Sequence, residues 1–429
     1  MRAEMTETDV LIVGAGIVGC AAAYYLARRG LSVRVLDRGR IGSEQSSRSW
    51  GFVRQQGRHV AEAPLAAQAL RMWDGLAAEL QWDIGFVRSG ILVLAETVED
   101  EERMLEGARE AHEHGVETRL LSPREISARE PQLAGGWRAG LLTEQDGNVE
   151  PIQATLAFAE AARRLGVIIQ ENTPVIGIET SAGIINGVRC ASRVYHSHTV
   201  LCAAGIGAAT LTRTIGISLP IQIVRACVAQ TVPTKPIVGT AVWSPHVAFR
   251  PRSDGSFTIG NGYRGIDAEY DLTLDALRHL RLFLPTYFAN RSIVKLHFGR
   301  PFFEALLRIF NAHGRFEPLP EPTVNSKLIR YNKQQFDRLI PTLRGIALAR
   351  SWAGLIDTTP DLVPIIGAVD SSARYFVAAG FNGHGLALGP VVGRVLSELI
   401  ADGKSSIDVR ALRPQRFAEG DVLRRQGAL

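Results

Sequence analysis

The chain has 429 residues, of which 46% are hydrophobic and 21% charged, and its formal net charge is +5. This length favours two domains. The basic residues are scattered and form no block interleaved with aromatic side chains, which argues against a nucleic-acid-binding protein. No stretch supplies the ~20 consecutive apolar residues of a membrane helix, so we expect a cytoplasmic protein, with peripheral attachment to a membrane left open.

The first predicted elements form a β-α-β unit. Residues 8–13 (TDVLIV) read as a buried strand, residues 20–29 as a helix that stops at Gly30, and residues 31–36 as a second strand that ends at Asp37. A glycine after the last helical residue is a common C-terminal signal. The three elements span about 30 residues, the length of one dinucleotide-binding unit.

Between the first strand and the helix lies the motif Gly14-x-Gly16-x-x-Gly19. Its glycines allow a tight turn, close approach of a pyrophosphate, and close packing of helix on strand, in that order. The helix start, which includes Ile17 and Val18, offers backbone N–H groups and a positive dipole end to phosphates. Asp37 is placed to bind a ribose hydroxyl, which disfavours NADP. The motif by itself leaves NAD and FAD open.

The next segment is a polar loop, residues 42–48 (GSEQSSR). Its hydroxyls and cation, Ser46, Ser47 and Arg48, together with Arg38, are suited to cover a pyrophosphate. An ordinary surface loop is the alternative.

Further elements follow in chain order. We expect helices at 61–80, 98–113 and 153–165, and strands at 90–95, 167–170 and 200–204. Residues 216–344 are richer in β signals and prolines, with an irregular polar stretch at about 311–333. The sequence 196–198 (HSH) is predicted to be a surface strand rather than a metal site, and the four cysteines are expected to be buried thiols in a reducing compartment.

The C-terminal part returns to α/β character. Residues 352–361 (WAGLIDTTPD) and 364–367 precede a strand at 375–378, a glycine-rich turn at 380–385 and a helix at 387–401. A glycine turn that enters a helix again presents backbone N–H groups, here suited to the anionic edge of a reduced flavin, which favours FAD.

Cofactor-type sequence therefore occurs in separated pieces. We predict a mixed α/β (α+β) fold with a Rossmann-type FAD-binding domain and an inserted β-rich substrate domain. The predicted FAD-binding domain comprises residues 1–85, 145–215 and 345–429, and the substrate domain comprises residues 86–144 and 216–344.

Across these segments the chain resembles the D-amino-acid oxidase-like FAD oxidoreductases, which include glycine oxidase, sarcosine oxidases, D-amino-acid dehydrogenases and flavoprotein subunits of opine and D-hydroxyproline dehydrogenases. The N-terminal motif, Arg48, residues 200–205 (VLCAAG), residues 249–260 (FRPRSDGSFTIG) and the C-terminal W-A-G, T-P-D and G-x-N-G-H-G motifs carry this resemblance. Further FAD-contacting residues implied by the resemblance are Val175, Ala203, Ala204, Gly205, Trp352, Gly354, Asp361, Gly383, His384, Gly385 and Leu386.

The resemblance implies an enzyme that passes hydride from substrate carbon to flavin and so oxidises a C–N bond. Its expected substrate is an N-substituted or cyclic amino or imino acid, such as D-hydroxyproline, an opine or an N-methyl amino acid. The electron acceptor is not specified, and partner subunits or a homo-oligomer are both compatible with the family. Two rivals remain: an FAD-dependent 2-hydroxy-acid dehydrogenase, and a non-catalytic flavin subunit of a multi-subunit complex.

Departures from relatives refine these expectations. Gly354 stands where covalent sarcosine oxidases have the flavin-linking cysteine, so we expect non-covalent FAD. Thr258 stands where oxygen-activating oxidases have a lysine, which favours a dehydrogenase. Ile356 and Ala387 replace the basic residues that anchor the substrate carboxylate in relatives.

Five residues are candidates for the substrate end, and a sixth, Arg58, competes with one of them. Arg54 is the candidate carboxylate anchor, because a guanidinium binds a carboxylate through two parallel hydrogen bonds, and Arg58 is its near competitor. Arg48 is expected near the flavin, with a charge pair in the pyrophosphate loop as the alternative. His384 is either a neutral wall residue or catalytic. Asn261 and Tyr263 either line the pocket or simply end a strand.

Overall fold

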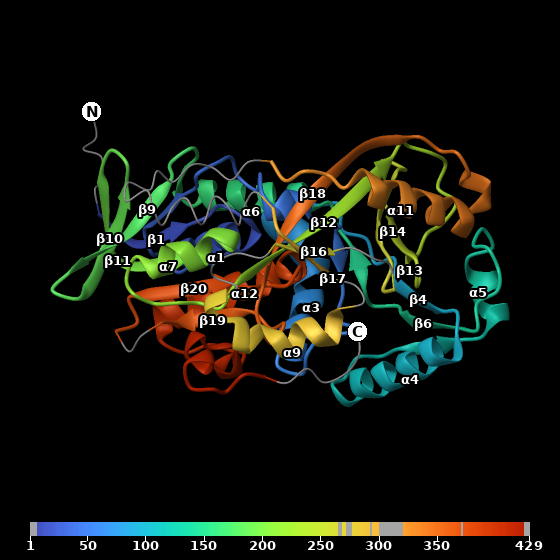
Figure 1. The fold of residues 1–429 in the computed structure, drawn as a ribbon. Helices are drawn as coiled ribbons and strands as arrows, with labels where there is room; N and C mark the ends of the chain where they lie inside the picture. Colours follow the sequence, from blue (N-terminus) through green and yellow to red (C-terminus); the bar gives the residue numbers. More distant parts are fainter. Residues whose placement is uncertain are drawn as a thin grey trace.

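The computed structural model describes residues 7–264, 268–271, 277–291, 294–299, 321–369 and 372–423. Two large sheets, one of eight strands and one of ten, form its framework (Figure 1). A short two-stranded sheet, β3 (Phe52–Val53) with β7 (Gly147–Asn148), lies with them.

The eight-stranded sheet is built around the predicted β-α-β unit. The strand β1 (Glu7–Val13) pairs in parallel with both β2 (Val33–Leu36) and β11 (Val194–Cys202). The remaining strands are β8 (Ile168–Gln170), β9 (Val175–Ser181), β10 (Ile184–Cys190), β19 (Ile365–Ala368) and β20 (Tyr375–Ala379). All four residues of β2 are buried, as expected for a parallel strand covered on both faces.

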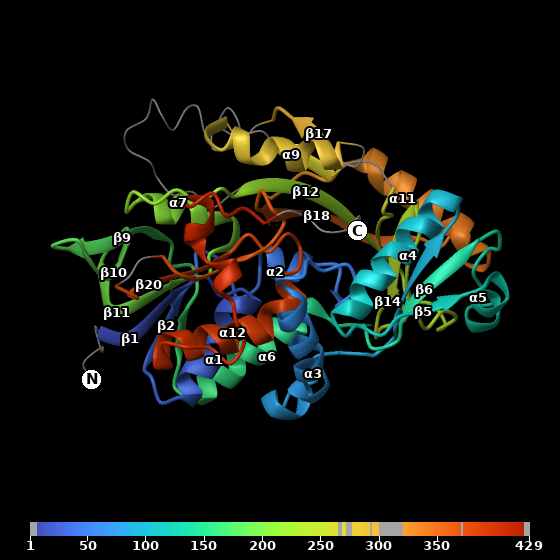
Figure 2. The ribbon, with the colours of Figure 1, turned by 90° about the horizontal axis from the view of Figure 1, so that it is seen from below.

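Helices cover both faces of this sheet. Val10 and Ile12 of β1 belong to the core shared with α1 (Ile17–Arg28), α3 (Ala63–Leu80), α6 (Pro151–Arg164) and α12 (Gly385–Asp402). Leu11 and Val13 face the other way, toward α7 (Ala208–Arg213). Figure 2 shows α1, α6 and α12 together on one side and α7 on the other. Because successive side chains of β1 point to opposite faces of the sheet, the strand contributes to two separate hydrophobic cores.

Small residues let α1 and α12 approach closely. A Cβ atom on Gly389 would lie 2.7 Å from Ile17, and one on Gly393 would lie 2.6 Å from Ala21. β1 and β20 both run parallel to β11, so the turns that follow these two strands and precede α1 and α12 lie at the same edge of the sheet.

The ten-stranded sheet contains most of the middle of the chain. Its strands are β4 (Ile91–Ala95), β5 (Arg119–Leu121), β6 (Ala139–Thr143), β12 (Gln222–Thr231), β13 (Ala241–Trp243), β14 (Val247–Pro251), β15 (Phe257–Asn261), β16 (Ala268–Asp271), β17 (Val294–His297) and β18 (Leu348–Thr358). Helices α4 (Val98–Glu113), α5 (Pro123–Arg129), α9 (Leu280–Asn290) and α11 (Ser326–Leu339) accompany it (Figure 2). The short elements that remain are α2 (Gln45–Arg48), η1 (Gly205–Gly207), η2 (Pro341–Leu343), η3 (Arg410–Leu412) and η4 (Pro414–Phe417).

The predicted irregular stretch at 311–333 was wrong from Ser326 onward, and its residues 311–320 lie outside the described part of the chain. Asn325 caps α11 by accepting hydrogen bonds from the N–H groups of Lys327 and Leu328. The helix buries Leu328, Ile329, Asn332, Phe336 and Leu339. Their spacing is helical, but the many polar residues of the exposed face concealed it in the sequence.

Other strand predictions were shorter than the observed elements. β11 begins at Val194 and pairs with β10, so the HSH sequence lies in a strand, as predicted, with His196 and His198 exposed. The strand β18 joins β12 in the ten-stranded sheet, although its sequence falls in the predicted FAD-binding segment 345–429. The predicted domain boundaries stay a prediction. By sequence β18 falls in the predicted FAD-binding domain, but it pairs with β12, which belongs to the predicted substrate domain.

Candidate functional site

A cavity of about 340 Å³ is lined by residues of both sheets. The sequence-predicted residues that line it are Gly14, Gly16, Ile17, Val18, Asp37, Arg38, Ser46, Arg48, Arg54, Val175, Ala203, Ala204, Gly205, Gly354, Gly383, His384, Gly385 and Leu386. The tertiary structure thus brings together the N-terminal motif, the end of β11, the strand β18 and the turn before α12.

One end of the cavity is formed by the turn between β1 and α1. Gly14 has a φ of +109°, and a Cβ atom there would lie 2.3 Å from the carbonyl oxygen of Ala203. Gly16 is the N-cap of α1 and offers no side-chain cap of its own, while Ser46 accepts a hydrogen bond from the N–H of Ile17 at 2.9 Å. Gly19 serves packing, since its Cβ would lie 1.9 Å from the Gly14 oxygen.

Asp37 directly follows β2 and lies beside this turn. Its carboxylate accepts hydrogen bonds from the N–H groups of Ala15 and Gly39, at 2.6 and 2.7 Å. Burial raises the pKa of Asp37, and the two backbone hydrogen bonds oppose that rise. A carboxylate has about four lone-pair positions, so Asp37 retains acceptors for the hydroxyls of a ribose.

A second set of backbone donors lies at the start of α12. Asp357, at the end of β18, accepts hydrogen bonds from the Gln45 side chain at 2.9 Å and from the N–H of Gly380 at 2.6 Å. Asn382 donates its N–H to the Asp357 carbonyl and adopts a left-handed φ of 52°. Asp357 therefore joins α2 and β18 to the glycine turn. We did not predict Gln45 or Asp357, although Asp357 lies within the WAGLIDTTPD motif.

These features fit a dinucleotide. The turn at Gly14 and Gly16 leaves room for a pyrophosphate, the N-termini of α1 and α12 supply donors, and Asp37 supplies an acceptor. The loop that carries Ser46 is held over the turn, since Gly42 donates its N–H to the Ala15 carbonyl at 2.9 Å.

The other end of the cavity contains arginines in different surroundings. Arg54 stacks on Trp243, with its guanidinium carbon 4.3 Å from the ring centroid. Within the described part of the chain, Nη1 of Arg58 is buried and has no hydrogen-bond partner. Arg48 is paired with Glu321 (Nη2 to Oε2, 2.7 Å) and donates to the Ala353 carbonyl at 3.1 Å. Arg48 thus lines the cavity but has its charge compensated.

Three aromatic residues missed from the sequence, Trp50, Phe52 and Trp243, line the cavity near these arginines. Phe52 and Trp243 stack with centroids 5.8 Å apart, and Trp50 is 6.3 Å from Trp243. A Cβ at Gly260 would lie 2.6 Å from the Trp50 ring, so this glycine admits the indole. Trp50 and Phe52 are neighbours on one short segment, whereas Trp243 lies on β13 much further along the chain, so no local pattern joins all three.

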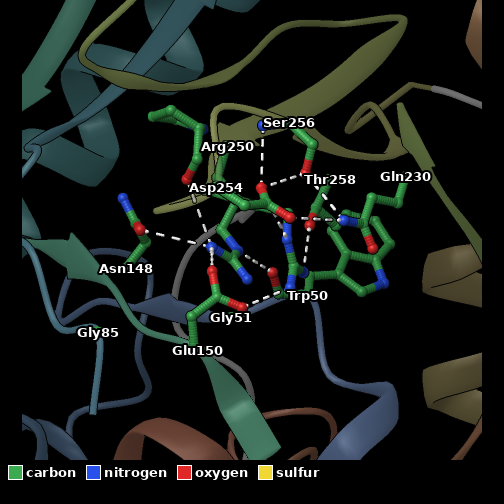
Figure 3. A network of polar contacts seen from close by, with 12 residues as sticks. Trp50, Gly51, Gly85, Asn148, Glu150, Gln230, Arg250, Asp254, Ser256 and Thr258 are labelled. Carbon is green, nitrogen blue, oxygen red and sulfur yellow. Dashed lines mark hydrogen bonds and ion pairs between the residues drawn. The ribbon is translucent and has the colours of Figure 1, made fainter. Parts of the chain in front are cut away.

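A buried charge network supports this aromatic wall (Figure 3). Arg250, on β14, is fully buried and donates through Nε to the Trp50 carbonyl and through Nη1 to Glu150 at 3.1 Å. Arg252 pairs with the second oxygen of Glu150. The network lies behind the cavity wall, so Arg250 is a support for Trp50 rather than an anchor for a substrate.

His384, the N-cap of α12, lies at the same end of the cavity as the arginines. Its Nδ1 is 3.0 Å from Oε1 of Glu62, the N-cap of α3. Burial lowers the pKa of His384 to about 4, and the charge of Arg58 acts in the same direction. His384 is therefore a neutral imidazole at neutral pH.

The remaining predicted residues lie elsewhere in the described structure. Tyr263 donates to the Leu94 carbonyl at 2.8 Å, and Asn261 accepts from Asn332 at 2.7 Å. Asp361 is fully buried in a two-pronged ion pair with Arg416, so its oxygens are occupied and its predicted cofactor contact is not supported.

Three further residues, Ser47, Trp352 and Thr258, do not line the cavity and form hydrogen bonds elsewhere. Ser47 donates to the Glu44 carbonyl at 3.2 Å, and Trp352 donates to the Arg48 carbonyl at 3.1 Å. Thr258 is buried and accepts from Arg252 at 3.3 Å. Strand-exit position or resemblance suggested these residues, and their roles at the site stay predictions.

Among the helices of the described residues, none combines the length and the apolar character that a membrane-spanning segment requires.

Comparison with known proteins identifies relatives along the whole chain. The glycine oxidase of Bacillus licheniformis is 26% identical over 404 residues, which cover 91% of this chain and 92% of the relative. The 4-methylaminobutanoate oxidase (formaldehyde-forming) of Paenarthrobacter nicotinovorans is 25% identical to this chain over 420 residues. The match covers 96% of this chain but 46% of the relative, so this chain spans about half of that protein's length.

The fold is shared with solved structures. The L-amino acid deaminase of Proteus myxofaciens superposes with a TM-score of 0.89 at 23% identity, over 97% of this chain and 95% of that one. Residues 9–399 match the DAO family, described as FAD dependent oxidoreductase. The cavity that fits a dinucleotide and this match over most of the sequence agree: the chain belongs to the DAO family of FAD-dependent oxidoreductases.

Proposed function

We propose that this protein oxidises the C–N bond of an amino or imino acid, with an N-substituted or cyclic substrate preferred. One observation carries the proposal: a single cavity has a dinucleotide cradle at one end and Arg54, Arg58, His384 and an aromatic wall at the other. The names of the relatives, glycine oxidase and 4-methylaminobutanoate oxidase, support an amine that also bears a carboxylate.

The side chains at the substrate end suit this reaction. A guanidinium binds a carboxylate through parallel hydrogen bonds. Arg58 lines the cavity, and its buried Nη1 has no hydrogen-bond partner among the described residues. Trp50, Phe52 and Trp243 exclude water and provide apolar surface for the rest of the substrate. An apolar site favours the neutral amine, the form that releases hydride. FAD, when bound, accepts that hydride.

We propose that FAD is held without a covalent link. A Cβ at Gly354 would lie 3.4 Å from the Arg48 side chain, and this position carries no nucleophilic side chain. Acid precipitation of the purified protein is expected to release yellow FAD into the supernatant. Flavin fluorescence that stays with the denatured polypeptide in a gel would show a covalent bond instead.

An anaerobic flavin-reduction screen tests the function. The holoenzyme is mixed with amino acids, N-methyl amino acids, cyclic imino acids and opines, and with the matching 2-hydroxy acids, while flavin absorbance is followed. Bleaching by an amine and not by its hydroxy analogue supports the proposal. Bleaching by hydroxy acids alone assigns a 2-hydroxy-acid dehydrogenase, and bleaching by none assigns a non-catalytic flavin subunit.

The same reduced enzyme shows its electron acceptor when it is mixed with oxygen or with an artificial dye. Thr258, which suggested a dehydrogenase, is buried against Arg252, so the choice between oxidase and dehydrogenase is left to the reoxidation rates.

All four cysteines are buried free thiols, which supports the proposed cytoplasmic location. A native mass measurement tests for self-association and for partner subunits.

A further inference from the structure

The pair formed by His384 and Glu62 is fixed between two helices. The His384 side chain is 18% exposed and that of Glu62 is 1% exposed, with Nδ1 and Oε1 3.0 Å apart. The two helices are also joined where Trp73 of α3 donates to the Ala387 carbonyl of α12 at 2.9 Å. The imidazole therefore has one orientation relative to the cavity that it lines.

This contact determines which nitrogen of the ring carries the proton. An ionised carboxylate only accepts hydrogen bonds, so Nδ1 of the neutral ring must be the donor. Nε2 is then unprotonated, and no described residue donates to it. Nε2 is a free acceptor on a side chain that lines the cavity beside Arg54 and Arg58.

The charges around the ring respond to a bound carboxylate. Glu62 favours the protonated ring, whereas burial, Arg58 and Arg54 disfavour it. Burial by itself raises the pKa of Glu62, whereas its contact with His384 and the positive charge of Arg58 lower it, and the net shift is downward. The ionised form of Glu62 is therefore favoured, and its second oxygen, Oε2, is buried without a hydrogen-bond partner among the described residues. A substrate carboxylate at Arg58 would offset the charge that opposes protonation of His384. The ring then becomes more basic when substrate is present.

We propose that His384 is the catalytic base that takes the proton of the substrate's ammonium group at Nε2. The inference rests on the proposed amine oxidation. The substrate N–H bond breaks, the Nε2–H bond forms, and the electron pair stays on the substrate nitrogen, which is then neutral. Glu62 is a positioning residue: it holds the Nδ1–H tautomer and stabilises the imidazolium. The proton passes to water after the product leaves.

The test is the pH dependence of anaerobic flavin reduction at saturating substrate, followed by stopped flow. In the wild type the proton stays within the complex, so the limiting rate is expected to be flat through neutral pH. In His384→Asn the rate should fall about tenfold for each pH unit below the apparent pKa of the bound amine, and approach the wild-type rate at high pH. In Glu62→Gln the rate of flavin reduction should also fall as pH decreases, but by a smaller factor than in His384→Asn.

His246→Asn is the matched control. His246 also contacts a carboxylate, with Nε2 3.0 Å from Glu96, but this pair is exposed to solvent on another part of the molecule. Its pH profile should equal that of the wild type. FAD content and the visible spectrum confirm that each variant holds its cofactor. Nitrogen NMR of the imidazole should show Nδ1 protonated in the wild type, and this signature should be disturbed in Glu62→Gln.

The outcomes separate this proposal from the proposed function. If amino acids reduce the wild-type flavin and His384→Asn loses the same factor at every pH, or loses nothing, His384 is not the base although the amine oxidation holds. An NMR signal from protonated Nε2 in the resting enzyme would also overturn the proposal. If no amino or imino acid reduces the wild-type flavin, the proposed function fails and the base assignment fails with it.

Discussion

At the scale of single residues, Arg54 and Arg58 at the substrate end of the cavity differ in their contacts with the rest of the protein. Arg54 stacks on Trp243, whereas Nη1 of Arg58 is buried and has no hydrogen-bond partner among the described residues. A buried donor without a partner is costly, so a ligand is expected to supply the acceptor.

We therefore expect Arg58→Met to cost about 2–5 kcal/mol of transition-state binding, the range for a partly buried charge pair with a substrate carboxylate. Arg54→Met should lose less, because stacking already occupies one face of its guanidinium. The measurement is kcat/KM for the preferred amino acid and for its decarboxylated amine, with Arg330→Met on the exposed face of α11 as the control. Equal efficiency of wild type and Arg58→Met would rule Arg58 out as the anchor.

Asp146 is expected to make the free energy of unfolding depend on pH. Burial raises its pKa to about 7, against opposing effects of the Gln55 N–H, Arg54 and Arg58. In the unfolded chain the carboxyl ionises near its ordinary pKa of 3.8. Between these two values the folded protein binds the proton and the unfolded chain does not. This group therefore lowers the free energy of unfolding as pH rises from about 4 to 7.

Asp146→Asn removes that cost and still offers an acceptor to the Gln55 N–H, which donates to Oδ1 at 2.9 Å. The variant should match the wild type at pH 4 and become the more stable protein by pH 8. The upper bound is about 1.4 kcal/mol for each pH unit in this interval. Thermal unfolding of both holoenzymes at several pH values measures it. A stability difference that does not change with pH would contradict the raised pKa.

At the scale of elements, the start of α12 depends on the end of β18. The two oxygens of Asp357 accept from Gln45 of α2 and from the Gly380 N–H of the turn before α12. An asparagine has only one acceptor oxygen, so one of these two donors would lose its partner in Asp357→Asn.

The expected cost of that lost acceptor is about 1–3 kcal/mol, seen as weaker FAD binding because the donors of α12 and the loop of α2 both shift. FAD affinity is measured by titrating the apoprotein with FAD and following flavin fluorescence. Asp402→Asn, at the exposed C-terminal end of the same helix, is the control and should bind FAD as the wild type does. Unaltered affinity in Asp357→Asn would show that the turn is held by other contacts.

At the scale of the whole molecule, Glu150 connects the two large sheets. It is the N-cap of α6, which packs on the eight-stranded sheet, and it pairs with Arg250 of β14 in the ten-stranded sheet (Figure 3). Its second oxygen pairs with Arg252, in the loop that follows β14. Glu150→Gln leaves buried guanidinium charges uncompensated, and this should lower the free energy of unfolding by about 3–5 kcal/mol.

Chemical denaturation of the holoenzyme tests this expectation. Asp408→Asn breaks an exposed pair with Arg410 and should leave the unfolding midpoint unchanged, because solvent screens such pairs. If Glu150→Gln unfolds at the wild-type midpoint, the network does not hold the two sheets together.

The sequence alone determined the cofactor end of this protein. The motif from Gly14 to Gly19, the strand that ends at Asp37 and the helix start at Gly385 are local patterns, in which a turn or a helix N-terminus is built from adjacent residues. The FAD cofactor and the mixed α/β fold were predicted from them and confirmed. The resemblance added the residues after β11 and on β18 that line the same cavity.

At the substrate end the sequence named Arg54, Arg58 and His384 as candidates, and only the tertiary structure decided which side chains surround them. Trp50, Trp243, Glu62 and His384 come from four separate segments, and their contacts depend on sheet pairing and helix packing that no local pattern encodes. Asn261 and Tyr263 show the converse: each follows the expected strand, but its side chain finds a partner away from the cavity. Backbone motifs can be read from the sequence because their geometry is local, whereas side-chain constellations depend on how distant segments pack together.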